Sequence, residues 1–155
     1  MTDKYRLSEH FHQKEFYIKE PKGNYEKFRD EHYDKMKDLV DTILEPMRQD
    51  LEFPIKISSG YRCRTHNIKA KGKANSHHLY NLDTSAVDIT GMNDATLQED
   101  LEAITEWLEE KSKDGKLFCY SYWNQVDNFV HISGLTQTSP RVNHQWREID
   151  GEALD

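Results

Sequence analysis

Two short apolar runs in the second half of the chain each carry one residue that can bind a metal. Asp88 lies within AVDI (residues 86–89), and His131 lies within FVHIS (residues 129–133). Short runs rich in β-branched residues are typical of strands, whose alternate side chains point to opposite faces of a sheet. If the apolar neighbours face a core, Asp88 and His131 face the other way and can meet across neighbouring strands. The pattern therefore predicts a small sheet with a polar site on one face.

The residues of this site indicate a metal, although a simpler interpretation stays open. A buried carboxylate is costly unless it is paired or binds a cation. The SHH run (residues 76–78) precedes Asp88 and offers further imidazoles, and the chain has eight histidines in all. Two imidazoles and one carboxylate would make a zinc site with three protein ligands and an open fourth position, as in catalytic zinc sites. The alternative is an Asp88 that faces solvent on an edge strand and a His131 that is hydrogen-bonded in the core.

The remaining patterns predict one α+β domain, a small antiparallel sheet with helices packed on it and the zinc site at the sheet. Apolar residues at helical spacing predict a short helix within residues 7–16, which Ser8 could cap, a long one over residues 25–51 and another over residues 95–113. Pro46 predicts a kink or a break in the long helix, and Asn93 or Asp94 can cap the last one. Alternation predicts strands over residues 53–58, 86–89, 117–123 and 129–133. The domain is expected to span residues 1–135, followed by a polar C-terminal extension over residues 136–155.

Composition excludes several classes of function. The net charge of −7 argues against a nucleic-acid-binding protein with a broad basic surface. No run of about 18 apolar residues is present, so no membrane association is expected. The first residues have no apolar h-region, so no secretory signal is expected. Cys63 and Cys119 are too few for a disulfide framework in a chain of this length.

Six sequence blocks, in a fixed order, point to a known family. They are LSEHF (7–11), LEPMR (44–48), PIKISSGYR (54–62), NSHHL (75–79), AVDI (86–89) and NFVHIS (128–133). Together they resemble the zinc-dependent peptidoglycan peptidases of the D-Ala-D-Ala carboxypeptidase and L-Ala-D-Glu endopeptidase group, particularly the short phage-associated members. The resemblance covers most of the chain, and the combination of blocks is more specific than any single histidine.

Carried over position by position, the resemblance implies a set of site residues. His78, Asp88 and His131 would bind zinc. Arg62 would face the substrate, where a guanidinium can hold a carboxylate in bidentate fashion. Ser76 would orient a ligand or contact the substrate. The simpler alternatives are a surface ion pair for Arg62 and a loop or capping role for Ser76.

The segment before Asp88 departs from the family pattern. Nine residues separate His78 from Asp88, where the family usually has six, and the usual glycine of that segment is missing. The insertion leaves two other assignments open, with His77 in place of His78 or Asp83 in place of Asp88.

The position of the general base also departs from the family pattern. Many members carry Glu or Asp three residues before the last histidine, and this chain has Asn128 there. An amide cannot take a proton, so the neighbouring Asp127 is the predicted base, with Arg62 as the second catalytic residue.

The resemblance implies a zinc metallopeptidase that hydrolyses peptide bonds in peptidoglycan stem peptides. It would be a phage endolysin found in the host cytoplasm before lysis, or an enzyme carried in the virion. The competing hypothesis is a non-catalytic virion protein that retains the peptidase fold and binds other virion proteins. No nucleic-acid or membrane partner is expected under either hypothesis.

Overall fold

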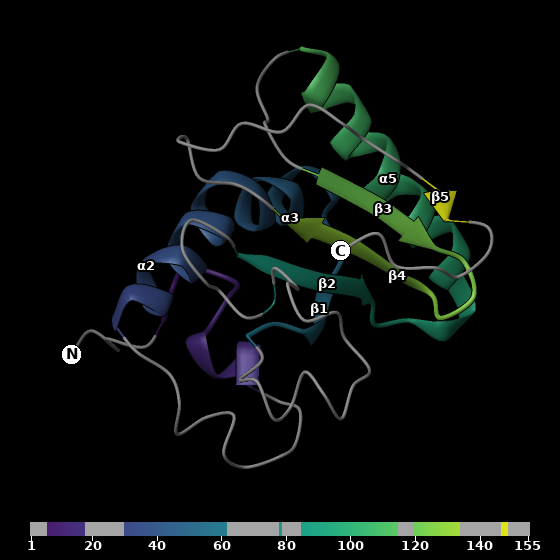
Figure 1. Cartoon of the computed structure of the whole chain (residues 1–155). Helices are drawn as coiled ribbons and strands as arrows, with labels where there is room; N and C mark the ends of the chain where they lie inside the picture. The colour runs from purple at the N-terminus through teal and green to yellow at the C-terminus, as the bar shows by residue number, and fades with distance from the viewer. Residues whose placement is uncertain are drawn as a thin grey trace.

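A five-stranded sheet carries the fold, and helices cover one of its faces (Figure 1). The computed structural model describes residues 6–17, 30–61, 78, 85–114, 120–133 and 147–148. Within them the helical elements are η1 (Gln13–Tyr17), α2 (Asp30–Leu39), η2 (Val40–Leu44), α3 (Glu45–Leu51), η4 (Asp94–Thr96) and α5 (Leu97–Lys113). The strands are β1 (Ile55–Ser59), β2 (Ala86–Gly91), β3 (Tyr120–Asn124), β4 (Phe129–Ser133) and β5 (Arg147–Glu148). None of the helices in these ranges is long and apolar enough to cross a membrane.

The strand order is β1-β2-β4-β3-β5, and the first four strands pair antiparallel. This confirms the predicted α+β class and the small antiparallel sheet. The short β5 pairs parallel with β3 and was not predicted. Its two residues lie in a polar stretch with no alternation, so the sequence pattern gives no signal for it.

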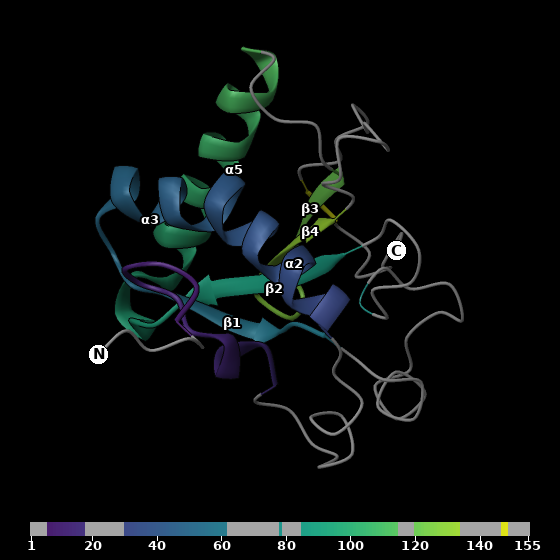
Figure 2. The same ribbon diagram turned by 90° about the vertical axis from the view of Figure 1, so that its left-hand side faces the viewer.

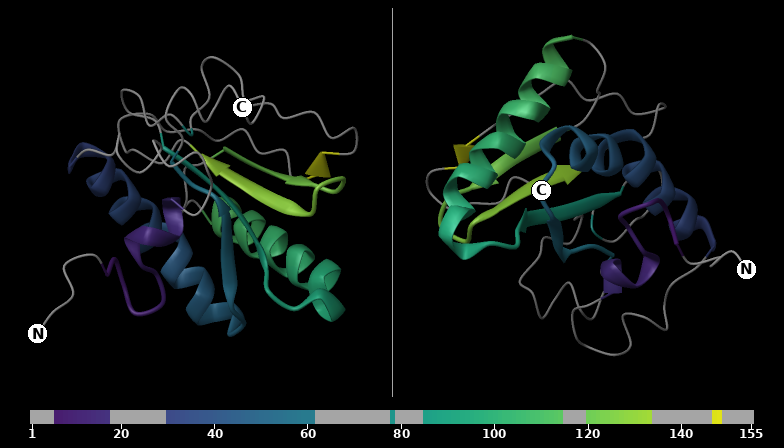
Figure 3. Two further views of the ribbon diagram at one scale, coloured as in Figure 1. Left: turned by 90° about the horizontal axis from the view of Figure 1, so that it is seen from below. Right: turned by 180° about the vertical axis from the view of Figure 1, so that it is seen from behind.

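The inner face of the sheet packs against the helices, as the view from behind shows (Figure 3). Along β2 and β4 the residues that alternate toward this side are Val87, Ile89, Val130 and Ile132, and all are buried in one apolar cluster. Because side chains alternate along a strand, Asp88 and His131 must lie on the opposite face. The apolar neighbours thus fix the direction of the two polar residues, as the sequence predicts.

A kink or a break was predicted at Pro46, and helical backbone continues from Asp30 to Leu51, so the break is excluded. Instead, the chain forms one wide π turn at η2, directly before α3. The Glu45 N–H bonds to the carbonyl of Val40, five residues earlier. Pro46 follows in the first turn of α3, where its missing N–H costs little. Single π turns of this kind accommodate a local irregularity inside a helix.

Asn93 caps the helical stretch before α5, because its side chain accepts a hydrogen bond from the backbone N–H of Ala95. This confirms one of the two predicted caps. The N-terminal helix is shorter than predicted, since only Gln13–Tyr17 is helical. Ser8, its predicted cap, instead donates a hydrogen bond to Glu45 of α3. A long-range contact with α3 here replaces the local one, and η1 lies beside β1 (Figure 2).

Candidate metal centre

One transverse row of residues crosses four strands on the outer face of the sheet. Asp88 of β2 is paired with Ser59 of β1 on one side and with His131 of β4 on the other. His131 is in turn paired with Tyr122 of β3. Direct cross-strand partners on one face have Cβ atoms about 4.5–5.5 Å apart. The register alone therefore brings a carboxylate, an imidazole and a phenol into contact.

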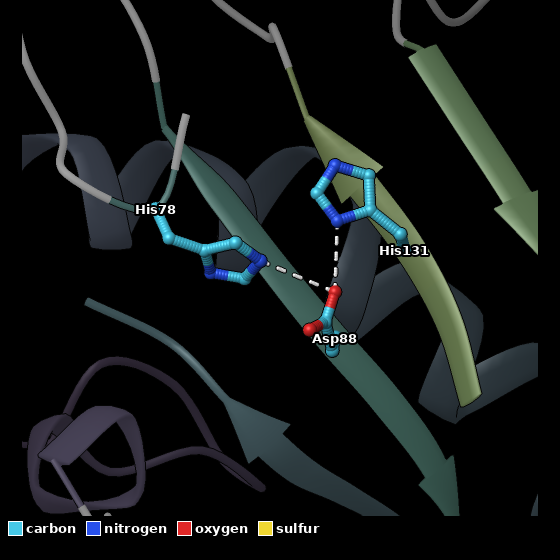
Figure 4. A group of neighbouring side chains, drawn as sticks. All are labelled: His78, Asp88 and His131. Carbon is cyan, nitrogen blue, oxygen red and sulfur yellow. Dashed lines mark hydrogen bonds and ion pairs between the residues drawn. The ribbon is translucent and has the colours of Figure 1, made fainter. Parts of the chain in front are cut away.

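His78 completes a group of three metal-ligating side chains around the Asp88 carboxylate (Figure 4). The Asp88 Oδ1 atom lies 2.8 Å from His131 Nδ1 and 3.2 Å from His78 Nε2. The two imidazole rings meet edge to face, with centroids 5.2 Å apart. Candidate ligand atoms of the three side chains all lie within 4.8 Å of one another.

The group is buried, which decides how its charge behaves. The exposed fractions are 2% for His78, 5% for Asp88 and 1% for His131. Burial by itself would raise the pKa of the Asp88 carboxyl, but the adjacent His78 and His131 outweigh it and hold that pKa well below its usual range. Asp88 is therefore an ionised carboxylate at neutral pH, which is the form that binds a cation.

The hydrogen bond behind His78 determines which of its nitrogens faces the group. His78 Nδ1 lies 2.7 Å from the carbonyl oxygen of Gly60. A carbonyl can only accept, so Nδ1 carries the hydrogen and donates it. In the neutral ring, Nε2 then has a lone pair directed at the Asp88 carboxylate. His78 Nε2 and Asp88 Oδ1 are both electron-rich, so their contact requires a proton or a cation between them. A metal ion would bind both atoms.

The donor set fits zinc. Zinc lies about 2.0–2.2 Å from imidazole nitrogens and carboxylate oxygens in tetrahedral sites, so two ligands of one ion are about 3.3 Å apart. The contacts of 2.8 and 3.2 Å to Asp88 Oδ1 lie near this value. The Gly60 carbonyl behind His78 is the kind of outer partner that fixes the tautomer of a metal-binding histidine.

Several predicted site residues lie outside the described residues. They are Arg62 and Ser76, together with the alternative ligands His77 and Asp83. The structure does bring together His78, Asp88 and His131, the set that the resemblance implies. Nine intervening residues therefore do not prevent His78 and Asp88 from meeting.

Asp127 and Asn128 lie on the turn that joins β3 to β4. The Asp127 side chain is exposed, and its backbone N–H donates to the side chain of Asn124. Three residues separate Asp127 from His131 along the chain, and Asp127 is not part of the buried group. The role of Asp127 as a base stays a prediction.

Asn128 has a structural reason to be an asparagine. Its backbone is left-handed, with φ of 59°, a conformation that asparagine tolerates better than most residues. Its side-chain oxygen accepts a hydrogen bond from Gln98 at the start of α5. The residue that departs from the expected catalytic pattern thus shapes the turn.

Two residues that contact the buried group, Gly60 and Tyr122, are not predicted from the sequence. Gly60 contributes its carbonyl group, which the residue type does not reveal. Tyr122 lies on a strand that was predicted, and its ring stacks on His131 at a centroid distance of 4.9 Å. The alternation of β3 could have placed Tyr122 on the face of the site, but only once the pairing with β4 was known.

Comparison with known families agrees with the geometry. The profile of the family described as Peptidase M15 matches residues 9–133. The chain belongs to the peptidase M15 family. The match includes all three residues of the buried group, and M15 peptidases are zinc enzymes. No curated protein and no solved structure matches the chain.

Membership of the peptidase M15 family changes how the buried group is interpreted. A histidine–aspartate–histidine cluster by itself indicates only that a cation can be held. M15 peptidases are zinc enzymes, so in this chain the same cluster is the group that could hold the zinc. The zinc site suggested by the sequence is therefore consistent with both the side-chain geometry and the family.

Proposed function

We propose that this M15 protein is a zinc metallopeptidase that hydrolyses peptide bonds in peptidoglycan stem peptides, as a phage lysis or virion-associated enzyme. The observation that carries the proposal is the buried group of His78, Asp88 and His131, whose nitrogens converge on one carboxylate oxygen. The family supports the peptidase chemistry. The stem-peptide substrate and the phage role come from the sequence resemblance.

Each of the three residues has a defined task in this proposal. His78 would present Nε2 and His131 would present Nδ1, while Asp88 would supply the negative charge. Zinc, when bound, polarises a carbonyl and lowers the pKa of water. The sheet register holds Asp88 and His131 in place, and the Gly60 carbonyl holds the His78 ring. The ligands are thus arranged before any ion arrives, which reduces the cost of binding it.

Arg62 and Ser76 are proposed to bind the substrate. Arg62 would hold a carboxylate of the stem peptide and fix its register, and Ser76 would supply a hydrogen bond. We expect Arg62→Ala to lower kcat/KM about ten- to hundredfold, since a hydrogen bond to a charged group is worth about 1.5–3 kcal/mol. Zinc content should stay unchanged. Wild-type kinetics would remove Arg62 from the site.

Asp127 is the proposed general base, and its exposed position makes this the assignment that most needs a test. General acid–base catalysis contributes about 10²–10⁴-fold, so Asp127→Asn should lower kcat by about 10² or more if the assignment is correct. Zinc content should not change, because Asp127 is not part of the buried group. An unchanged kcat would exclude Asp127 as the base.

The test of the function is digestion of purified peptidoglycan with identification of the products by mass spectrometry. We expect new termini within the stem peptides, no products after chelation, and recovery when zinc is restored. Asp88→Asn is the matched inactive control. Intact peptidoglycan in the presence of zinc-loaded protein would contradict the proposal.

A second candidate function is a non-catalytic virion protein that keeps the fold. The observation in its favour is that Asn128 serves the turn and Gln98 rather than the buried group. Zinc binding with no turnover of any stem peptide would support this candidate. Activity gained by Asn128→Glu in an inactive parent would identify the protein as a disabled relative of the enzymes.

A further inference from the structure

Tyr122 contacts the metal centre without belonging to it. It is 2% exposed and lies opposite His131 in the pairing of β3 with β4. The two rings are stacked, with centroids 4.9 Å apart and an interplanar angle of 22°. Phe129 meets the Tyr122 ring edge to face at 6.3 Å. The phenol ring is therefore held by its own neighbours while it covers one face of the imidazole.

The His131 ring is restrained from three directions. Tyr122 covers a face, the His78 ring approaches edge to face at 5.2 Å, and Nδ1 contacts Asp88 Oδ1. A half turn of the imidazole about χ2 would put carbon in the place of Nδ1 and lose the contact with Asp88. Any smaller rotation would tilt the ring out of its near-parallel stack on Tyr122.

We propose that Tyr122 is a positioning residue for His131, whose stacked ring holds the imidazole in the plane in which Nδ1 meets Asp88. The inference rests on the proposed function, because it takes His131 as a metal ligand. Tyr122 also interacts electrostatically with the imidazole. An imidazole that binds a cation gains partial positive charge, and the electron-rich face of a tyrosine favours such a charge. Tyr122 therefore stabilises the loaded state as well as the orientation.

Two substitutions separate the ring from the rest of the side chain. Tyr122→Phe keeps the stacked ring and should keep the zinc affinity of the wild type. Tyr122→Met fills the space without a ring, and we expect zinc affinity to fall about tenfold, the low end of the effect of changing the partner of a metal ligand. Tyr33→Met is the matched control, because Tyr33 packs against the core from α2, on the other face of the sheet.

Affinity is measured by competition with a chromophoric chelator, on full-length protein that circular dichroism shows to be folded. The absorption spectrum of the cobalt(II) form gives a second readout, since a shifted His131 changes the ligand field and a loss of stability alone does not. Equal zinc affinity and equal cobalt spectra for Tyr122→Met and the wild type would overturn the inference. A fall in Tyr33→Met as large as in Tyr122→Met would do so too.

A measurement on the wild-type protein covers the case in which Tyr122→Met does not fold. Nuclear magnetic resonance of ¹⁵N-histidine-labelled, metal-free protein should show His131 ring protons that are shielded by the stacked tyrosine. Unshielded ring protons would overturn the inference. If the shielding is present but the wild type takes up no zinc, the proposed function fails together with the role of Tyr122 toward a metal. If zinc binds and Tyr122→Met behaves as the wild type, only the positioning role fails.

Discussion

Among the described residues, two groups combine histidine and carboxylate side chains, and they differ in burial and in the partners of their carboxylates. His78, Asp88 and His131 lie buried on the outer face of the sheet. The second group, Glu9, His10 and Glu45, joins the N-terminal segment to α3, with Glu9 exposed and the other two partly buried. In both groups the candidate ligand atoms lie within 4.8 Å of one another. Proximity alone therefore does not distinguish them.

The use of the carboxylate does distinguish them. Glu45 accepts hydrogen bonds from the Ser8 hydroxyl, the His10 backbone N–H and the His10 ring, at 2.5, 2.8 and 2.7 Å. It also accepts one from Gln49. These donors come from protein groups that need no ion, so the second group is a structural clasp between the N-terminal segment and α3. The contacts of Asp88 Oδ1 are with the two nitrogens that would bind the metal.

The largest expected difference between the two groups concerns zinc affinity. Asp88→Asn removes the only negative charge among the three proposed ligands, and we expect zinc affinity to fall by at least about a hundredfold, since changes to outer partners alone cost ten- to hundredfold. Glu45→Gln should leave it unchanged. Both are measured by chelator competition. An equal loss in the two variants would show that the comparison is wrong.

Gly60 lies between the N-terminal segment and the buried group, because it contacts Phe16 of η1 and its carbonyl bonds to His78. A substitution there should reduce zinc affinity less than Asp88→Asn does. A Cβ atom added at Gly60 would lie 2.8 Å from the Cα of Phe16 and 2.9 Å from its carbonyl oxygen. Gly60→Ala must therefore push η1 and β1 apart and move the carbonyl that orients His78. We expect a loss of about 1–3 kcal/mol in the free energy of unfolding and zinc affinity weakened about tenfold.

Denaturant unfolding and chelator competition measure the two effects of Gly60→Ala. Ser58→Ala is the control on the same strand, because its hydroxyl donates to the backbone carbonyl of Asp88 and not to a ligand atom. A Gly60→Ala protein that is destabilised but keeps full zinc affinity would show that the N-terminal segment and the metal centre are independent.

Substitution of Glu45 should have the smallest effect, a loss in the free energy of unfolding that depends on pH. Burial raises the pKa of Glu45, but hydrogen bonds from Ser8, His10 and Gln49 outweigh burial. Together they lower this pKa from its ordinary value of 4.5 to about 2. Because the folded pKa is the lower one, the clasp is fully stabilising above about pH 4.5 and loses its contribution as the pH falls toward 2.

Glu45→Gln tests the clasp. At pH 7 we expect a loss of about 1–2 kcal/mol in the free energy of unfolding, since a few hydrogen bonds to a charged group are replaced by weaker ones. The difference in the free energy of unfolding between variant and wild type should shrink as the pH is lowered from about 4.5. Denaturant unfolding at several pH values measures it. A gap that does not change with pH would mean that the charge of Glu45 contributes nothing.

The sequence predicts the sheet and the meeting of Asp88 with His131 well, because alternation places both residues on one face. Apolar neighbours on either side of Asp88 and His131 leave these residues one face on which to lie. The strand register that brings them together is long-range, and it was inferred only from the need to pair a buried carboxylate. His78 could not be placed by alternation, since it lies outside the strands, so its assignment depended on the resemblance to known peptidases.

Other features could not be predicted, because contacts between distant segments decide them. Pro46 predicts an irregularity in the helix, but the sequence does not show that it takes the form of a π turn at η2. Ser8 follows the pattern of a helix cap but bonds to Glu45, 37 residues away. The parallel pairing of β5 and the stacking of Tyr122 on His131 likewise depend on the pairing partner of β3.

The most direct measurement of the central claim is anomalous diffraction at the zinc absorption edge, from crystals of the full-length protein grown with zinc. We expect one strong peak per chain, within bonding distance of His78 Nε2, Asp88 Oδ1 and His131 Nδ1, and no peak between Glu9, His10 and Glu45. The peak should disappear in crystals of Asp88→Asn. A peak at the Glu45 group, or none at the Asp88 group, would contradict the account.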